Sequence, residues 1–147
     1  MSHTYAQNLV HLVFSTKGRS RAIPKEFQPK LWSYAAGVCH NHDIHAQAIG
    51  GFDDHLHLLI QLPPALPLAR AANIIKSNTS RWAHEQQQGL VWQEGYGAFS
   101  VSASVVQAVI RYIQNQPVHH KKMDFRTEFL LLLKKHNVPF DPKFVLG

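Results

Sequence analysis

The stretch that decides the fold is Asp54-His55-Leu56-His57-Leu58-Leu59-Ile60-Gln61-Leu62. In a β-strand, successive side chains alternate between the two faces of a sheet. One face would then carry a continuous aliphatic row suited to a core, made of Leu56, Leu58, Ile60 and Leu62. The other face would carry His55 and His57 side by side, close enough for both rings to bind one metal ion. The alternative is a pair of partly buried histidines that are hydrogen-bonded to neighbouring residues.

Composition limits the class of protein. Fifteen Lys and Arg against nine Asp and Glu give a net charge of +6, which favours a polyanionic partner. The single Cys39 excludes an intramolecular disulfide and a cysteine-rich zinc site. No signal peptide is visible, and the longest aliphatic or aromatic run, Phe129–Leu133, is far shorter than the ~20 residues of a membrane span. We therefore expect one cytoplasmic domain over residues 1–147, with no membrane partner.

The order of expected elements indicates the fold class. Apolar patterns predict strands at 5–16, 44–52, 54–62 and 98–102, and helices at 25–42, 68–87, 102–116 and 124–137. The first six elements match the ferredoxin-like (RRM-like) β-α-β-β-α-β plan, an α+β fold with an antiparallel sheet, here followed by two additional C-terminal helices. We expect a catalytic core over about 4–123 and a C-terminal helix and tail over 124–147. Helices on one face would leave the other face, or an edge, free for a ligand.

A second pair of polar residues lies on the third predicted helix. Tyr112 and Gln116 are four residues apart and project from one side of a helix. The alternative is a packing tyrosine with an exposed amide one turn later. A tyrosine nucleophile needs a strong electrophile, such as a phosphodiester polarised by a metal ion. Two His and one Gln are neutral ligands whose mixed N and O donors suit Mg²⁺ or Mn²⁺. Pro117 disfavours helical geometry at Gln116, which leaves the position of this amide open.

These motifs, taken together, are specific. The sequence resembles the single-tyrosine HUH transposases of the insertion-sequence-200-like type, which include REP-associated tyrosine transposases. The resemblance rests on His55-Leu56-His57 and Tyr112-Ile113-Gln114-Asn115-Gln116. It extends to His11–Thr16, Pro63-Pro64, Lys76-Ser77-x-Thr79-Ser80-Arg81-Trp82, Trp92-Gln93-x-Gly95-Tyr96 and His119-His120-Lys121-Lys122, and so covers most of the chain.

The resemblance implies a metal-dependent nuclease and strand transferase that acts on single-stranded DNA. By this resemblance, His55, His57 and Gln116 hold a divalent ion, Mg²⁺ or Mn²⁺, and Tyr112 attacks the scissile phosphate to form a 5′-phosphotyrosine. Members of the family recognise hairpins at element ends. They commonly work as homodimers in which one subunit's tyrosine completes the other's metal site.

Eight basic residues are candidates for DNA contacts: Lys17, Arg19, Arg21, Arg70, Lys76, Arg81, Lys121 and Lys122. The polar face of the helix at 68–87 fits an ordinary solvated surface equally well. Two other functions stay open at this point. One is a domesticated or inactive nucleic-acid-binding module of the same fold, and the other is a metal-dependent phosphodiesterase that uses water as its nucleophile.

Overall fold

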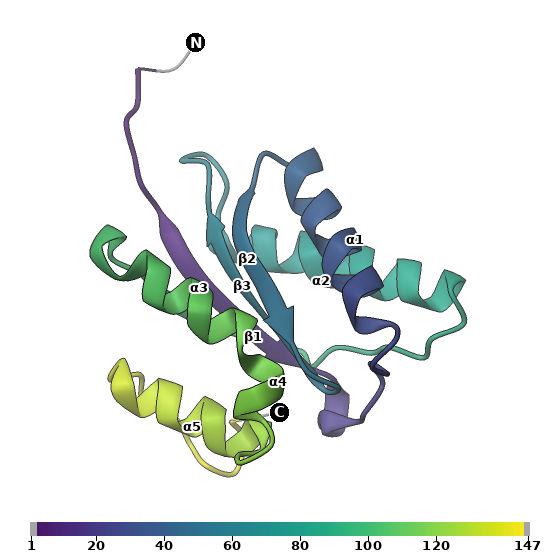
Figure 1. Ribbon diagram of the computed structural model, residues 1–147. Helices are drawn as coiled ribbons and strands as arrows, with labels where there is room; N and C mark the ends of the chain where they lie inside the picture. The colour runs from purple at the N-terminus through teal and green to yellow at the C-terminus, as the bar shows by residue number, and fades with distance from the viewer. Residues whose placement is uncertain (1–2, 146–147) are drawn as a thin grey trace.

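The computed structural model describes residues 3–145, which form a four-stranded antiparallel sheet with helices on both faces (Figure 1). The strands are β1 (Leu9–Ser15), β2 (His45–Gly51), β3 (His55–Gln61) and β4 (Gly97–Ser100), in the spatial order β2-β3-β1-β4. The helices are α1 (Gln28–Asn41), α2 (Leu68–Glu85), α3 (Val106–Gln114), α4 (Gln116–His119) and α5 (Phe125–Lys135), with short 3₁₀ turns η1 (Lys17–Arg19) and η2 (Ala103–Val105). This arrangement confirms the ferredoxin-like α+β fold with C-terminal helices.

The histidine strand β3 lies inside the sheet. It pairs with β1 on one side, where His57 is opposite Val13, and with β2 on the other, where His57 is opposite Gly50. A strand that is hydrogen-bonded along both edges holds its side chains in a fixed register. The backbone beneath the two histidines is therefore supported by a neighbouring strand on each side.

The two faces of β3 separate as the alternation predicts. Leu56, Leu58 and Ile60 are fully buried in the main core, together with side chains from α1 and α2. His55 and His57 point to the opposite face. Figure 1 shows α1 and α2 on one side of the sheet and α3, α4 and α5 on the other.

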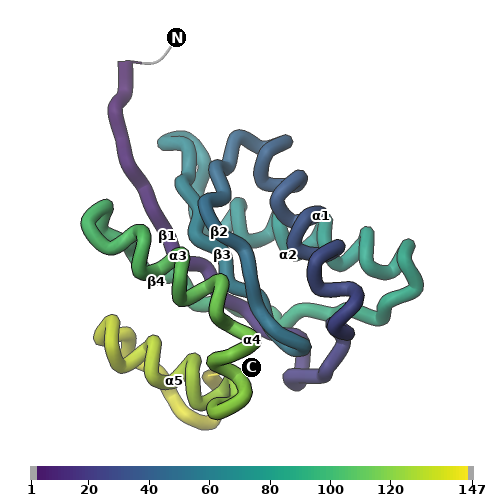
Figure 2. The backbone as a smooth tube through the Cα atoms, viewed as in Figure 1, coloured from purple at the N-terminus to yellow at the C-terminus, as the bar shows by residue number. Residues whose placement is uncertain are grey.

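The second face of the sheet is not free, in contrast to the expectation from the sequence. The α3 side chain Ile113 packs on Leu59 of β3, and α5 packs on β1 and β4 through Phe125, Phe129 and Leu133. The tube in Figure 2 shows the green and yellow C-terminal part of the chain lying across this face. Helices α3 and α5 are both amphipathic, and they cover this face of the sheet because doing so buries their apolar sides.

Two glycines allow the second layer to approach the sheet closely. A Cβ atom at Gly50 of β2 would lie 2.5 Å from the backbone oxygen of Ile113, and one at Gly97 of β4 would lie 2.5 Å from the Phe129 ring. No real side chain tolerates such contacts. Gly50 in particular lets the end of α3 come down onto the edge of β2, next to the histidines of β3.

The helix predicted over 102–116 is divided. A side-chain cap at Ser102 begins η2, α3 ends at Gln114, and Asn115 (φ −93°, ψ 13°) separates α3 from α4. Pro117 lies in the first turn of α4, where a missing N–H costs nothing. The expected continuation of one helix to Gln116 is wrong, because Pro117 cannot follow in the interior of a helix.

Residues 3–145 contain no helix that is both long and apolar enough to cross a bilayer.

Candidate functional site

His55 and His57 are completely buried, and each ring is held from behind by a hydrogen-bond partner on Nδ1. Nδ1 of His55 lies 2.8 Å from the Asp54 carboxylate, and Nδ1 of His57 lies 2.8 Å from Nε2 of His11 on β1. The Nε2 atoms of both rings face the same region between β3 and α5. Partners on Nδ1 fix ring orientation and leave Nε2 for a ligand, as in histidine metal sites generally.

Tyr112 projects from α3 into the same region. Its ring lies edge-on to His57, with 5.7 Å between ring centroids, and its hydroxyl donates a hydrogen bond to Oε2 of Glu128 on α5. Partial burial, and then the Glu128 carboxylate, raise the pKa of the Tyr112 hydroxyl above its ordinary value. The phenol is therefore neutral in this arrangement.

Gln116 is fully buried although the helix breaks before it. Its Oε1 lies 2.8 Å from Nε2 of His55, and its Nε2 donates a hydrogen bond of 3.0 Å to Oε2 of Glu128. The break at Asn115 and the new helix from Gln116 keep this amide inside the site. The structure thus brings together all four residues predicted from the two motifs; the metal-binding roles of His55, His57 and Gln116 and the catalytic role of Tyr112 stay predictions.

Glu128 occupies the centre of the cluster and was not predicted from the sequence. Its carboxylate is 2% exposed and lies 3.2 Å from Nε2 of His57 and 2.9 Å from Nε2 of His120. Burial alone would raise the pKa of Glu128, but hydrogen bonds from His120 and His57 outweigh it and hold this pKa well below its usual range. For His120, burial alone would lower the pKa. The hydrogen bond to Glu128 outweighs burial, so the pKa of His120 is raised above its ordinary value. A buried anion therefore lies among imidazoles.

Four residues around the motifs carry no role in the sequence argument: His11, Asp54, His120 and Glu128. Only Glu128 has a visible signal. It lies on the apolar side of α5, three residues after Phe125 and one before Phe129, where a charged side chain is unexpected. His11, Asp54 and His120 reach the site through strand pairing and the turn after α4, which no periodic pattern shows.

The eight basic candidates separate into two groups. Five lie in segments next to the site, on or beside η1 and after α4: Lys17, Arg19, Arg21, Lys121 and Lys122, all exposed. Three lie on α2, across the sheet from the site: Arg70, Lys76 and Arg81. Lys76 donates hydrogen bonds to the backbone oxygens of Glu94 and Gly95, and so serves the loop before β4.

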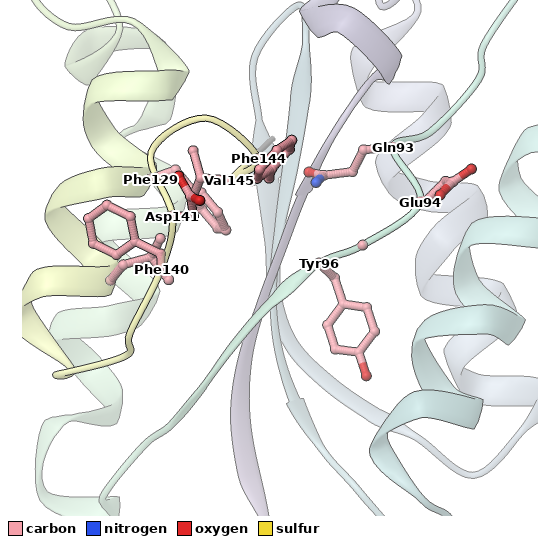
Figure 3. A pocket seen from close by; sticks show the side chains of 10 residues that line it. Gln93, Glu94, Tyr96, Phe129, Phe140, Asp141, Phe144 and Val145 are labelled. Atoms are coloured by element: carbon pink, nitrogen blue, oxygen red, sulfur yellow. The ribbon is translucent and has the colours of Figure 1, made fainter. Parts of the chain in front are cut away.

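Two hollows flank this region. One of about 440 Å³ opens beside Tyr112 between β4, α3 and α5, and its lining includes His11, Val109, Lys135 and His136. The other, of about 420 Å³, lies between the loop before β4 and the C-terminal tail (Figure 3). Figure 3 shows Gln93, Glu94 and Tyr96 on one side of it and side chains of α5 and the tail on the other. The hollow beside Tyr112 reaches the cluster, and so does a smaller one of about 190 Å³ that is lined by Tyr112, His119 and Glu128.

Known proteins share sequence or fold with this chain. Residues 4–116 match the family model described as transposase IS200 like. The transposases for insertion sequence element IS200 from Salmonella typhimurium and Salmonella typhi are each 23% identical over 124 residues, which cover 79% of this chain and 81% of the relative.

Two solved structures share the fold. A provisionally assigned transposase from Deinococcus radiodurans has a TM-score of 0.58 at 18% identity, over 79% of this chain and 95% of the other. A REP-associated tyrosine transposase bound to a REP hairpin has a TM-score of 0.60 at 17% identity, over 82% of this chain and 73% of the other. Because the family model spans most of the sequence and includes both motifs, the chain belongs to the IS200-like transposase family.

Proposed function

We propose that this protein cuts single-stranded DNA and transfers the cut strand through a covalent bond to Tyr112. The observation that supports this proposal is the meeting of Tyr112, His55, His57 and Gln116 in one cluster of a single chain. A neutral phenol beside a set of metal-type donors is suited to attack on a phosphodiester that a cation has polarised.

In the proposed reaction, the Tyr112 oxygen attacks the phosphorus, and the bond between phosphorus and the 3′ oxygen breaks. The phenolic proton leaves along the hydrogen bond to Glu128, and the departing 3′ oxygen takes up a proton to become a free 3′-OH. The other product is a 5′-phosphotyrosine. Attack on it by the 3′-OH of another strand reverses these steps, joins the strands and frees Tyr112. The bond energy is kept in the phosphotyrosine, so no nucleotide cofactor is required.

The donors at the site fit Mg²⁺ or Mn²⁺. His55 and His57 offer Nε2 and Gln116 offers Oε1, a mixed set of neutral N and O ligands. A bound ion would supply positive charge to a phosphate oxygen. Asp54 and His11 hold the two rings so that Nε2 faces the reacting region.

DNA would approach through the 440 Å³ hollow beside Tyr112, where Lys135 lies at the wall. The basic residues next to the site would contact backbone phosphates and set the position of the strand. The hairpin held by the structurally similar REP-associated transposase supports hairpins as ligands of this chain too. We further propose a homodimer. The cytoplasmic location and the division into a core over 4–123 and an added helix and tail over 124–147 also stay predictions.

The test is incubation of the protein with labelled single-stranded DNA from the flanks of its own gene plus Mn²⁺, followed by denaturing electrophoresis. We expect a covalent adduct that Tyr112→Phe abolishes without loss of hairpin binding, while Tyr96→Phe, outside the cluster, leaves the adduct intact. Adduct formation by Tyr112→Phe would refute the tyrosine mechanism. Hairpin binding without any adduct would indicate an inactive binding module, and cleavage without an adduct would indicate a water nucleophile.

A further inference from the structure

Glu128 lies outside the part of the chain that matches the family model. The match ends at residue 116, whereas Glu128 lies on α5. Its carboxylate nonetheless has the most polar partners in the cluster. Oε1 faces Nε2 of His57 and of His120, and Oε2 accepts hydrogen bonds from Tyr112 and Gln116. The helix that carries it is held on the sheet independently, by Phe125, Phe129 and Leu133.

The distances around Oε1 of Glu128 match those between neighbouring ligands on one ion. Ligands about 2.1 Å from an octahedral ion lie about 3 Å from each neighbour. Oε1 of Glu128 lies 3.2 Å from Nε2 of His57 and 3.6 Å from Nε2 of His55, and the latter lies 2.8 Å from Oε1 of Gln116. The ligand atoms of His55, His57 and Glu128 all lie within 4.8 Å of one another. One ion can therefore contact His55, His57 and Glu128, and Oε1 of Gln116 lies beside His55 at the distance of a neighbouring ligand.

The charge of the cluster leads to the same conclusion. An ionised carboxylate that is 2% exposed needs cationic partners or a metal. His55 and His57 each have a hydrogen-bond partner on Nδ1, and each directs Nε2 toward this carboxylate. The space between the two Nε2 atoms and the carboxylate therefore suits a positive charge. Glu128 also belongs to the other group of possible ligands in residues 3–145, formed with His119 and His120, and it is the only residue common to both groups.

We propose that Glu128 is the fourth protein ligand of the divalent ion, bound through Oε1, while its Oε2 holds the Tyr112 hydroxyl beside that ion. This inference rests on the proposed function, because it concerns the same ion. The resulting site has two imidazoles, one amide and one carboxylate, all from one chain. α5 thereby becomes part of the metal site as well as cover for the sheet.

The experiment measures Mn²⁺ binding directly, from the electron paramagnetic resonance signal of free Mn²⁺ at increasing metal concentration. We expect Glu128→Gln to weaken Mn²⁺ binding at least tenfold, and Glu128→Asp to recover part of that loss because it restores the charge. Glu85→Gln, at the exposed end of α2 on the other side of the sheet, is the matched control and should bind as the wild type does. His119→Gln should also bind as the wild type does, which separates the two groups of ligands.

Equal affinity in wild type and a folded Glu128→Gln would overturn the inference and leave the proposed function standing. A loss of affinity in His119→Gln with none in His57→Gln would place the ion elsewhere and overturn it too. Absence of Mn²⁺ binding by the wild type would overturn both proposals.

A second measurement needs no variant. Hydrogen–deuterium exchange of the wild-type protein, with and without Mn²⁺, reports whether the ion restrains α5. A ligand on this helix predicts slower exchange of amides in 125–135 when Mn²⁺ is bound. Unchanged exchange in α5 at a metal concentration that saturates binding would contradict a ligand there.

Discussion

The hydroxyl of Tyr112 donates a hydrogen bond to Oε2 of Glu128, sixteen residues later and on a different helix. The same carboxylate contacts His57 through its other oxygen. One side chain thus touches both the candidate nucleophile and a candidate metal ligand. Its position ties the C-terminal helix to the two motifs that identify the family.

Gly50 is expected to be essential for the position of α3. A Cβ atom at this residue would lie 2.5 Å from the Ile113 backbone oxygen, so Gly50→Ala must push α3 away from β2. We expect a loss of about 1–3 kcal/mol in the free energy of unfolding, measured by urea denaturation, and a weaker covalent adduct. Gly37→Ala is the control: nothing lies within 4 Å of its Cβ position in α1, and we expect it to stabilise the protein slightly. Equal stability of Gly50→Ala and wild type would refute the close approach.

The metal-free protein should lose stability between pH 7 and pH 5. Burial lowers the pKa of His11 to about 3 and that of His57 to about 4, whereas both groups titrate near 6.5 in the unfolded chain. As the pH falls below 6.5, these histidines become protonated in the unfolded state but stay neutral in the folded state. Each of them therefore lowers the free energy of unfolding by about 2 kcal/mol between pH 7 and pH 5. His120 acts in the opposite direction, because its pKa is raised in the folded state and it adds stability at low pH.

His11 and His57 together remove about 4 kcal/mol and His120 opposes them, so we expect a net loss below about 4 kcal/mol in the free energy of unfolding from pH 7 to pH 5, measured by urea denaturation in EDTA. In His11→Asn the loss should be clearly smaller, whereas a change at the exposed His45, His45→Asn, should leave it unchanged. Constant stability across this range would show that the buried histidines accept protons in the folded protein.

The site should be completed within one subunit. The hydroxyl of Tyr112 and the candidate ligands meet in a single chain, with the Tyr112 ring 5.7 Å from that of His57. Mixing Tyr112→Phe protein with His57→Ala protein should therefore restore no adduct formation, even if the two form mixed dimers. Recovery of activity in the mixture would demonstrate a tyrosine that acts on the partner's ion.

The two groups of basic residues should differ in their effect on DNA binding. Arg19 and Lys121 lie in segments next to the site, and each phosphate contact to a single strand contributes about 0.7 to the slope of log K against log salt. We expect Arg19→Ala and Lys121→Ala to reduce this slope, measured by fluorescence anisotropy with a hairpin. Arg70→Ala, on α2 at the other face of the sheet, is the control and should leave the slope unchanged. An equal effect at Arg70 would place the DNA across α2.

The sequence predicted the structure correctly where a local residue pattern determines the direction of side chains. The alternation in β3 predicts which side chains are buried among helices α1 and α2, and which face carries His55 and His57. The position of Gln116 could not be predicted, because Pro117 affects helix geometry and only the fold shows where the amide then lies. Glu128 could not be placed either, since contacts between α5 and β3 depend on how the two layers pack. An acidic residue on the apolar side of a helix was the one hint available.

Because α5 covers one face of the sheet, its removal by truncation would affect the candidate site. A fragment that ends where the family match ends, at residue 116, would retain both histidines, the tyrosine and the glutamine. It would also expose the ring of His55, which stacks on Phe125 with 4.5 Å between centroids, and the apolar surface of Val13 and Phe99. A shortened version of this chain that keeps the candidate site intact should therefore extend at least through Lys135.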